Sequence, residues 1–477
     1  MLAFYSVLMW CAQPFLRRKL ARRGRAEPGY LTHIEERFGR YLPETLPAFE
    51  SFEQGTLDQR FVWIHAVSLG ETRVAGVLLA ALRQRLPGMR LLLTHGTATG
   101  RAQGQRLLQA GDVQVWQAWD TRAATERFIR QFQPRIGIMM ETELWPNMAA
   151  TCARHGIPLV LANARLSEKT YQSTLRLAWL ARPAYQSLAA VWAQTSADAR
   201  RLEALGAPGV PASGVFGNLK FDARVDAVQL AQGRAWRLQT GRPVVVFASS
   251  REGEELQLLQ YLQKSSLNTM PAGVNNADEA IENIAKKQFS TSTSAAGVQW
   301  LMVPRHPQRF DQVAALIVQQ GFGVSRRSQW MARAEAPAAA DIWLGDSLGE
   351  MALYYGLSDV ALLGGSFEPL GGQNLIEAAA CGCPVVMGPS TFNFLEAAQL
   401  AVQAGAALQV ASLPQAVQAA GALLGTAAAL DSARTAALTF AAAHQGAADK
   451  TAAAVQTLLL PGITSPTRRS RAPDRRP

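Results

Sequence analysis

Free carboxylates follow two apolar, strand-like runs in the first half of the chain. Glu71 lies just past the run 61–67, after a glycine turn and near the start of a helix, and Glu141 and Glu143 follow the run 135–139 directly. The helix dipole favours an ionised carboxylate at a helix start, and position alone favours this structural role for Glu71. The alternative is a general base that removes a proton from a bound hydroxyl.

Basic side chains occupy comparable places further along the chain. Lys220 is a lone cation in an apolar context, where it pairs either with a phosphate or with a nearby acid. Arg305 and His306 directly follow the strand-like run 300–303. Because the planar guanidinium of arginine suits bidentate contact with phosphate, Arg305 is a candidate anion ligand.

The stretch 359–396 has the pattern of a strand, a glycine loop, a helix and a second strand. Asn374 can cap the helix, and Glu377 follows three residues later, as in a capping box. Free N–H groups at such a helix start bind phosphate-sized anions. An ordinary capped helix has the same spacing, so the pattern leaves both interpretations open. The loop glycines, which let the backbone approach a ligand closely, are Gly364, Gly365, Gly371 and Gly372.

Metal and redox chemistry have no support in the sequence. No Asp-x-Asp pair stands at a strand end, and no His/Asp cluster has metal-ligand spacing. We therefore expect arginine, lysine and helix N-termini to stabilise phosphate charge, with no metal and no cofactor. The four cysteines (Cys11, Cys152, Cys381 and Cys383) show no disulfide or zinc spacing and are expected to be buried thiols in a reducing compartment.

Strands that alternate with helices predict an α/β protein with parallel sheets covered on both faces. With 477 residues and 48% hydrophobic composition, two domains are expected rather than one. The alternation restarts near residues 223–241, which indicates two doubly wound halves with an active site in the crevice between them. The strand-like runs are 61–67, 90–94, 113–116, 135–139, 157–162, 191–194, 244–248, 300–303, 342–344, 360–363 and 384–387.

Both ends of the chain are basic, and the formal net charge is +11. Such a charge indicates an anionic partner. No aromatic-interleaved basic motif supports nucleic acid, so an anionic membrane surface is the favoured partner. The residues 461–477 are expected to form a disordered basic tail, and the polar stretch 264–297 a solvated insertion.

The N-terminal residues 1–16 carry no charge and precede six basic residues within 17–25. A full membrane span needs about 20 apolar residues. The basic flank follows the apolar run, which is the reverse of a cleavable signal peptide. We expect an uncleaved anchor that spans or lies on the membrane, with the rest of the chain in the cytoplasm. A buried helix of the globular body is the alternative.

Seven sequence blocks resemble those of the 3-deoxy-D-manno-octulosonic acid (Kdo) transferases, in the order of that family and over most of the chain. The blocks are HAVSLGET (65–72), METELWPN (140–147), LANARLS (161–167), GNLKFD (217–222), VPRHPQRF (303–310), GDSLGEM (345–351) and GGSFEPLGGQNLIEAAACGCPVVMGPSTFNF (364–394).

The resemblance implies a GT-B fold, with two Rossmann-like domains facing a cleft. It implies inverting, metal-independent transfer of Kdo from CMP-Kdo to a lipid A precursor (lipid IVA) at the cytoplasmic side of the inner membrane. The expected organisation is an anchor at 1–25, an acceptor-binding domain at 26–225 and a donor-binding domain at 226–460, whose part 397–460 is helical. The number of Kdo residues transferred is not encoded in any motif.

The family's site residues carry over to matching positions. The resemblance implies that Glu71 is the general base and that Glu141 and Lys220 stabilise the transition state. Two positions depart from the family, which usually has histidine where Gln373 and Arg251 stand here. Leu375-Ile376 replaces a more usual Pro-Leu. The implied CMP contacts are Pro304, Arg305, Leu348, Gly349, Glu350, Asn374, Leu375, Ile376 and Glu377.

Two other function classes stay open from the sequence. A sugar-nucleotide epimerase with the same two halves would need no lipid acceptor. A membrane-tethered protein that only binds the nucleotide would form no product.

Overall fold

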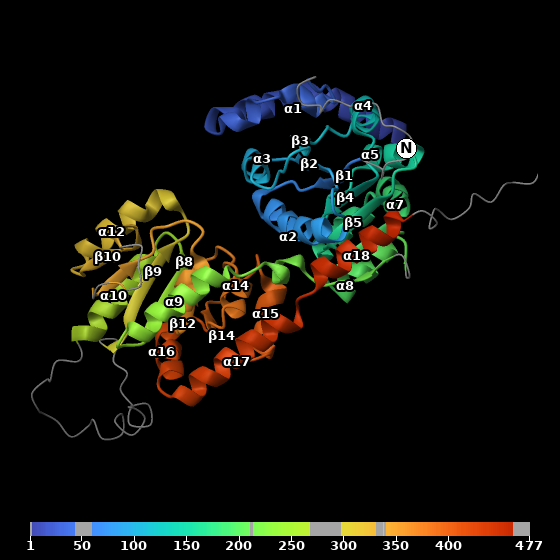
Figure 1. The fold of residues 1–477 in the computed structure, drawn as a ribbon. Coiled ribbons are helices and arrows are strands. Elements are labelled where there is room, and N and C mark those ends of the chain that lie inside the picture. The colour runs from blue at the N-terminus through green and yellow to red at the C-terminus, as the bar shows by residue number, and fades with distance from the viewer. Residues whose placement is uncertain are drawn as a thin grey trace, which may run out of the picture. The chain divides into compact units, whose positions relative to one another are not determined.

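The computed structural model describes residues 2–42, 60–209, 213–267, 297–330, 337 and 340–460. The chain forms two compact units, one made of Met1–Ala223 with Gln445–Pro477 and the other of Arg224–His444. Figure 1 shows a separate sheet in each unit. Most of the expected insertion at 264–297 and the whole expected tail at 461–477 lie outside the described residues.

The first unit is built on a parallel sheet with the strand order β3-β2-β1-β4-β5-β6-β7. Its strands are apolar and mostly buried on both faces, as parallel sheets require. The strand order reverses between β1 and β4, and sheets of this type bind ligands outside the carboxyl ends of the strands at such a switch point. The strands are β1 (Val62–His65), β2 (Leu91–His95), β3 (Val113–Trp116), β4 (Ile136–Met140), β5 (Leu159–Ala164), β6 (Ala190–Ala193) and β7 (Gly214–Val215).

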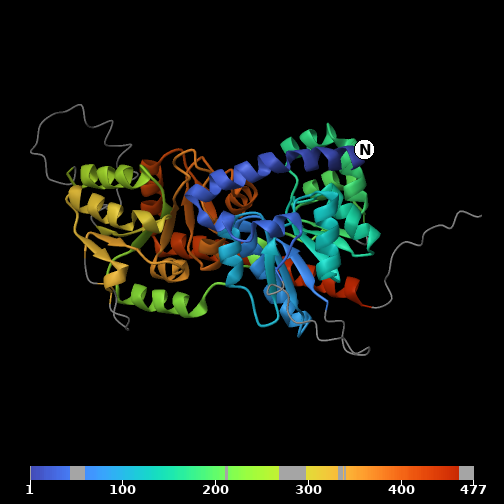
Figure 2. The same cartoon turned by 90° about the horizontal axis from the view of Figure 1, so that it is seen from above.

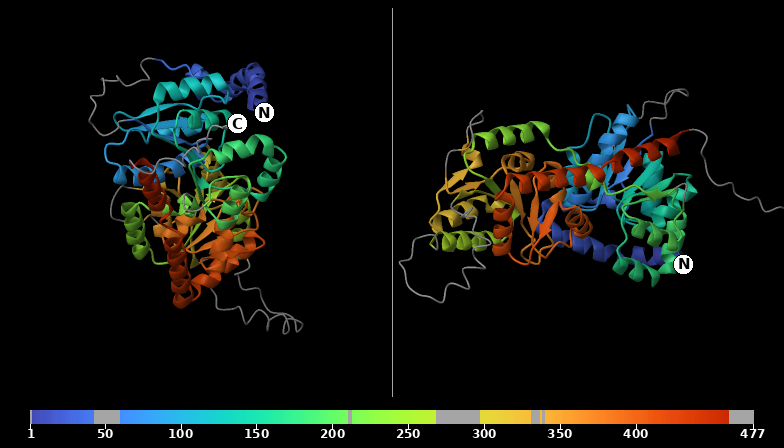
Figure 3. Two further views of the ribbon diagram at one scale, coloured as in Figure 1. Left: turned by 90° about the vertical axis from the view of Figure 1, so that its right-hand side faces the viewer. Right: turned by 90° about the horizontal axis from the view of Figure 1, so that it is seen from below.

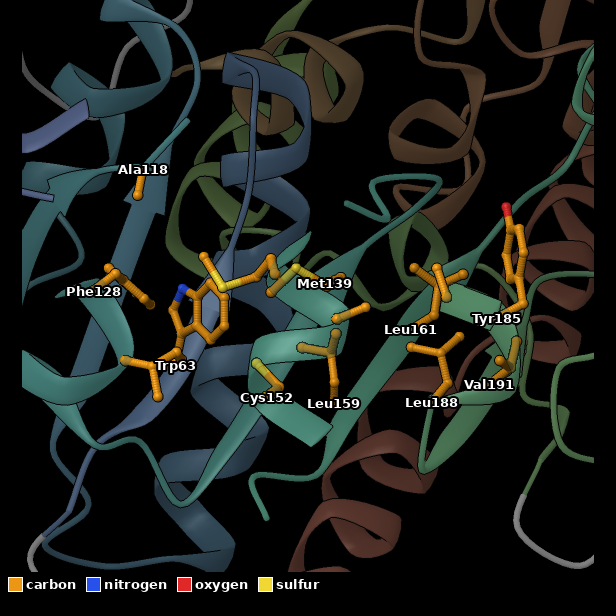
Figure 4. Packing of buried hydrophobic residues seen from close by; sticks show 14 of the residues in the cluster. Trp63, Ala118, Phe128, Met139, Cys152, Leu159, Leu161, Tyr185, Leu188 and Val191 are labelled. Atoms are coloured by element: carbon orange, nitrogen blue, oxygen red, sulfur yellow. The ribbon is translucent and has the colours of Figure 1, made fainter. Parts of the chain in front are cut away.

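Two clusters of buried side chains cover the two faces of this sheet. On one face, Trp63, Phe128 and Met139 belong to a cluster that Figure 4 shows from close by. The rings of Trp63 and Phe128 lie 4.8 Å apart between centroids. The α-helices of the unit are α1 (Leu2–Ala26), α2 (Leu69–Arg85), α3 (Ala98–Gln105), α4 (Arg122–Phe132), α5 (Pro146–Arg154), α6 (Glu168–Leu175), α7 (Ala178–Gln186), α8 (Ser196–Ala204) and α18 (Ala447–Leu459). Short 3-10 helices are η1 (Pro28–Leu31), η2 (Ile34–Phe38) and η4 (Leu219–Asp222).

The second unit repeats the same arrangement with the strand order β10-β11-β9-β8-β12-β13-β14. Here the order reverses between β8 and β12, which places the second switch point at their carboxyl ends. All strand pairs of this sheet are parallel. The strands are β8 (Val244–Ser250), β9 (Gln299–Pro304), β10 (Val324–Arg326), β11 (Ile342–Leu344), β12 (Val360–Leu363), β13 (Val385–Met387) and β14 (Ala407–Gln409).

Helices flank this second sheet, and two of them cross closely. A Cβ atom on Gly233 of α9 would overlap the backbone of α13, so the absence of a side chain there permits the contact. The helices are α9 (Ala227–Gln239), α10 (Glu254–Leu267), α12 (Phe310–Gln319), α13 (Met351–Leu357), α14 (Leu375–Ala380), α15 (Leu395–Gln403), α16 (Leu413–Leu424) and α17 (Ala427–Ala443), with η6 (Pro307–Arg309) and η7 (Arg327–Gln329).

The last helix, α18, lies in the first unit, whereas the sequence placed residues up to 460 with the donor-binding domain. It packs against α2, and Ala452 and Val455 are fully buried in the cluster beneath it. Figure 3 shows this helix in red at the end of the described chain. The Asp222 carboxylate accepts hydrogen bonds from the N–H groups of Gly446 and Ala448, and so caps the start of α18.

Helix α1 is a single helix of 25 residues on the surface of the first unit (Figure 2). Ser6 of this helix donates a hydrogen bond to the side chain of Asn147 at 2.8 Å, and Leu20 and Gly24 are buried. Large apolar side chains point to the exterior: Phe4, Val7, Leu8, Trp10 and Phe15. Part of α1 therefore belongs to the globular body, while its apolar outer surface stays exposed.

Among the described residues, no single helix has both the length and the hydropathy needed to cross a membrane. The bent pair Leu413–Leu424 with Ala427–Leu459 meets that criterion by length and composition alone.

Candidate active site

The switch point of the first unit positions Glu71 through the start of α2. The Ser68 hydroxyl caps the helix by accepting the N–H of Glu71 at 3.3 Å. The Glu71 carboxylate in turn accepts the Ser68 hydroxyl proton and the Val67 N–H, both at 2.9 Å. This reciprocal cap fixes the carboxylate at the carboxyl end of β1. The structural role considered for Glu71 is therefore real, and it also orients the group.

The electrostatic surroundings of Glu71 suit proton abstraction. Burial raises the pKa of Glu71 to about 6, the two hydrogen bonds oppose this rise, and the charges of Glu141 and Glu143 add to it. A carboxylate with this pKa is ionised at neutral pH, yet it is more basic than an ordinary glutamate. The general base predicted from the resemblance therefore has a pKa of about 6 at the carboxyl end of β1, and its catalytic role stays a prediction.

Glu141 lies at the carboxyl end of β4, directly beside β1. Its φ of 58° is in the left-handed region, which costs free energy for a non-glycine residue and is typical of functional sites. Its carboxylate lies 4.0 Å from the ammonium of Lys220, and both side chains are about one quarter exposed. The predicted residues Glu71, Glu141 and Lys220 therefore come together at the same edge of the sheet.

Lys220 reaches this edge because η4 is held by residues that the sequence interpretation did not single out. The side-chain oxygen of Asn163, at the end of β5, accepts the N–H of Leu219 at 3.0 Å. The side-chain oxygen of Asn218 accepts the N–H of Lys220 at 3.0 Å. The LANARLS block contains Asn163, and its φ of 52° shows a special backbone position that sequence spacing does not reveal.

In the second unit, Arg305 follows β9 and Gln373 follows the glycine loop after β12. The Arg305 Nε donates a hydrogen bond to the side-chain oxygen of Gln373 at 3.1 Å. Gly365, with φ +68°, lies beside both Gln373 and Arg251, and a Cβ there would lie 3.2 Å from the Gln373 amide nitrogen. The two positions that depart from the family pattern therefore adjoin the same glycine.

Several guanidinium groups lie at the carboxyl ends of β8 and β9, and two of them form ion pairs there: Arg251 with Glu252 at 3.1 Å and Arg309 with Glu255 at 2.8 Å. The pKa of His306 is lowered by burial, and also by the nearby charges of Arg251 and Arg305. The charges of Arg251 and Arg305 therefore both act on the His306 ring. This edge of the second sheet is therefore suited to an anion such as a phosphate.

Helix α14 starts at the same edge. The side-chain oxygen of Asn374 accepts the N–H of Ile376 at 3.1 Å, so the predicted cap is confirmed. The helix begins at Leu375 although the more usual proline is absent there. Leu375 and Ile376 are buried, so these two positions would meet a ligand through their backbone. Glu377 lies in the first turn of this helix.

The loop after β11 holds the remaining predicted CMP contacts. Gly349 has φ +80°, and its carbonyl accepts the side-chain N–H of Gln229 at 3.0 Å. The Glu350 carboxylate accepts a hydrogen bond from Arg327 at 2.7 Å, whereas Leu348 is 73% exposed. Since β11 pairs with β9, whose last residue is Pro304, this loop and Arg305 lie at neighbouring strand ends.

Glu254 holds these strand-end loops together, a role that the sequence analysis did not predict. Its fully buried carboxylate accepts the N–H groups of Gly365 at 2.8 Å, Arg251 at 2.9 Å and Phe367 at 3.2 Å. The glycine loop after β12 and the loop after β8 are thereby tied to one side chain. A Glu in the first turn of a helix gives no signal of such distant partners.

Replacing Glu254 with glutamine is expected to lower the free energy of unfolding by about 2–4 kcal/mol, because an amide NH₂ would face backbone N–H donors in a buried place. Urea unfolding followed by circular dichroism measures this loss. Glu252→Gln is the matched control, since Glu252 is 55% exposed and its ion pairs are worth about 1 kcal/mol or less. Equal losses in both variants would contradict the organising role of Glu254.

No group of three or more His, Cys, Asp and Glu side chains that could hold a metal ion occurs within the described ranges. All four cysteines are free thiols, and Cys152, Cys381 and Cys383 are buried as expected, whereas the expectation was wrong for Cys11, which is exposed on α1.

Comparison with known proteins gives consistent results at the level of the family. Residues 32–223 match the family model described as 3-deoxy-D-manno-octulosonic-acid transferase (kdotransferase). A 3-deoxy-D-manno-octulosonic acid transferase of Bordetella pertussis is 43% identical over 403 residues, which cover 83% of this chain and 87% of the relative.

Two solved structures resemble this chain in fold. A glycosyltransferase from Rickettsia africae ESF-5 has a TM-score of 0.50 at 13% identity, over 85% of this chain and 100% of that one. A UDP-N-acetylglucosamine 2-epimerase has a TM-score of 0.51 at 13% identity, over 84% of this chain and 96% of that one. The fold is thus that of the GT-B glycosyltransferases, and because it is shared with an epimerase it does not by itself select the reaction.

Proposed function

This chain belongs to the 3-deoxy-D-manno-octulosonic acid (Kdo) transferase family and is a glycosyltransferase of lipopolysaccharide biosynthesis; from that premise we propose that it transfers Kdo from CMP-Kdo to a lipid A precursor, with inversion at the anomeric carbon and without a metal ion. The observation that carries the proposal is the oriented Glu71 carboxylate, with its pKa of about 6, at the first switch point. Family membership supports the proposed donor, and the geometry of the site supports the proposed roles of the residues.

In the acceptor half, Glu71 removes the proton from a sugar hydroxyl of the lipid as that oxygen attacks the anomeric carbon of Kdo. One carboxylate oxygen stays oriented by Val67 and the other by Ser68. Displacement from the face opposite the leaving group inverts the anomeric configuration. The proton ends on Glu71, and the C–O bond to CMP breaks as the new C–O bond forms.

Lys220 and Glu141 assist beside the base. The Lys220 ammonium stabilises negative charge that develops in the transition state, while Glu141 holds this cation in place at 4.0 Å. A carboxylate beside the base also keeps the pKa of Glu71 raised.

In the donor half, the phosphate of CMP is bound by Arg305, with Arg251 and the N–H groups at the start of α14 beside it. Gln373 orients Arg305 through the hydrogen bond at 3.1 Å. Pro304 and the backbone of Leu348, Gly349 and Glu350 complete the nucleotide contacts. Glu377 accepts hydrogen bonds from the ribose hydroxyls, and Asn374, Leu375 and Ile376 present the helix start.

The proposed place of action is the cytoplasmic side of the inner membrane. The exposed apolar residues of α1 would enter the interface, and the basic residues within 17–25 would contact anionic headgroups at about 1 kcal/mol each. An apolar and a basic signal together give stable attachment where one alone would be marginal.

The test is an incubation of the purified chain with CMP-Kdo, in the presence and in the absence of lipid A precursor, with each reaction run both with and without EDTA. We expect a Kdo-bearing lipid, detected by mass spectrometry, only when the acceptor is present. Turnover without acceptor would favour an epimerase or hydrolase. Binding of CMP with no product under any condition would favour a protein that only binds the nucleotide. Loss of product in EDTA would overturn metal independence.

A further inference from the structure

Helix α1 packs on the first unit along one side only. Residues at every third or fourth position of the helix are buried or half-buried, which is the spacing of a single helix face. They are Tyr5, Met9, Ala12, Leu16, Leu20 and Gly24. The N-terminal end of this inner side lies beside α5 (Figure 1).

Two residues near the start of α1 make polar contacts on this inner side. The Tyr5 hydroxyl forms a hydrogen bond with the Asp120 carboxylate. A hydroxyl that donates to an ionised carboxylate forms a charge-assisted bond, about twice as strong as a neutral one. The Ser6 hydroxyl lies 2.8 Å from the side-chain oxygen of Asn147 and 2.8 Å from the Leu2 carbonyl oxygen. Because Ser6 has one proton for two acceptors, the contact of Tyr5 is the stronger of the two.

The partners of these hydroxyls hold the start of α5. This helix begins at Pro146, and the residue before it provides no side-chain cap. The cap comes instead from Asp120, whose fully buried carboxylate accepts the N–H of Asn147 at 3.0 Å and of Met148 at 2.8 Å. The Asn147 side chain donates in return to the Asp120 carbonyl at 2.6 Å.

The Tyr5 hydroxyl also favours the ionised form of this cap. Burial raises the pKa of Asp120 to about 6, while the two N–H groups and the Tyr5 hydroxyl oppose the rise. A carboxylate accepts all of these hydrogen bonds only when it is ionised. Loss of the Tyr5 hydroxyl therefore weakens the cap of α5, although Tyr5 itself does not touch that helix start.

The segment 141–147 joins β4 to this helix start and carries Glu141 and Glu143. Its first end is fixed to the sheet, because the Glu141 N–H donates to a backbone carbonyl of β5 at 3.0 Å. Its second end is fixed by Asp120. Burial is the main cause of the raised pKa of Glu71, and the charges of these two glutamates add to it. The geometry of the segment thus sets how strongly they act on the base.

We propose that α1 positions the active site as well as presenting an apolar surface: Tyr5 and Ser6 hold the start of α5, and through it the segment 141–147, in place beside Glu71. They are positioning residues, because they act through other side chains and touch no reacting atom. The inference rests on the proposed role of Glu71 as the base. Turnover then depends on how firmly α1 is held on the first unit.

Hydrogen exchange followed by mass spectrometry tests the contact without any turnover. In the double variant Tyr5→Phe with Ser6→Ala, peptides that cover 141–150 should exchange about tenfold faster or more. The reason is that the N–H groups of Asn147 and Met148 are bonded to a carboxylate that has lost a partner. Peptides of the second unit should exchange as in the unmodified chain.

The matched control is the double variant Tyr171→Phe with Ser173→Ala. It removes the same two hydroxyls from α6 of the same unit, where Tyr171 is half-buried and Ser173 is exposed. Exchange in 141–150 should stay unchanged in this control. Faster exchange in the Tyr5/Ser6 variant within α1 alone, with none in 141–150, would overturn the inference, because α1 would then detach without loosening the segment.

The pH profile of kcat/KM is a readout that a purely structural contact would not move. A looser segment holds its two carboxylates further from Glu71 on average and admits water, and both changes lower the pKa of Glu71. In the Tyr5/Ser6 variant the midpoint near 6 should fall by about half a pH unit, and kcat should fall roughly three- to tenfold. The KM for CMP-Kdo should not change. Faster exchange with an unchanged midpoint and kcat would overturn the positioning role.

Single variants separate the two hydroxyls. Tyr5→Phe alone should produce most of the effect of the double variant, because it removes the charge-assisted bond. Ser6→Thr keeps a hydroxyl and should behave like the unmodified chain, whereas Ser6→Ala should show a small effect. Equal behaviour of Ser6→Thr and Ser6→Ala would overturn the part of Ser6. Failure of the proposed function would appear differently, as absence of Kdo-bearing lipid from the unmodified enzyme, and hydrogen exchange would still decide whether α1 holds the segment.

Discussion

Glu71→Gln is expected to lower kcat for Kdo transfer by about 10²–10⁴-fold, the usual loss when a general base is removed. Glutamine keeps nearly the same shape and still fits the third position of a capping box, so α2 should form as before. The KM for CMP-Kdo should stay within about twofold, because the proposed donor contacts lie in the other unit. Initial rates with saturating acceptor and varied donor measure both quantities.

The pH profile gives this variant an internal control. In the unmodified enzyme the base must be ionised, so kcat/KM should rise with pH through a midpoint near 6 and level off about one to two pH units above it. The residual activity of Glu71→Gln should lack that rise. Glu168→Gln is the matched control, because Glu168 also lies in the first turn of a serine-capped helix. Activity near that of the unmodified enzyme in Glu71→Gln would remove Glu71 from the role of base.

Arg305→Gln is expected to reduce kcat/KM for CMP-Kdo by about 10²–10³-fold, because it removes a charge-assisted contact to the phosphate that leaves. Arg305→Lys should recover only part of this loss, since an ammonium cannot make a bidentate contact or reproduce the hydrogen-bond geometry to Gln373. Steady-state kinetics with varied donor give the numbers.

Arg224→Gln controls for the loss of one positive charge in the same unit, because Arg224 is exposed and outside the proposed site. It should leave kcat/KM unchanged. A change confined to the acceptor KM in Arg305→Gln would contradict the assignment of Arg305 to the donor phosphate.

Local sequence patterns predicted the elements that carry the site. The run before Glu71 became β1, the glycine turn led into α2, and Asn374 caps α14 as expected. These features depend on residues within about one turn of each other, where capping and hydrophobic periodicity act. The raised pKa of Glu71 could not be predicted in this way, because part of its cause is the charge of Glu141 and Glu143, which follow the neighbouring strand β4.

Contacts across long sequence separations could not be predicted. Asn163 accepts the N–H of Leu219, which lies 56 positions later in the sequence, and so holds the segment that contains Lys220. Glu254 accepts the N–H of Gly365 in the glycine loop, 111 positions later. Helix α1 forms one wall of a cavity whose other walls follow four different strands. Charge and hydropathy predicted that α1 is a membrane anchor. Neither property indicates which part of the first unit the buried side of α1 packs against.

The placement of α18 sets the order in which the two units can fold on the ribosome. Ala452 and Val455 complete the core under α2, but they are synthesised only after the whole of Arg224–His444. The first unit, although it begins at the N-terminus, therefore keeps one apolar face uncovered until the last helix emerges, while the second unit is already complete in sequence. Since exposed apolar surface on nascent chains promotes aggregation, translation of residues 224–444 is the interval in which this chain most needs chaperone protection.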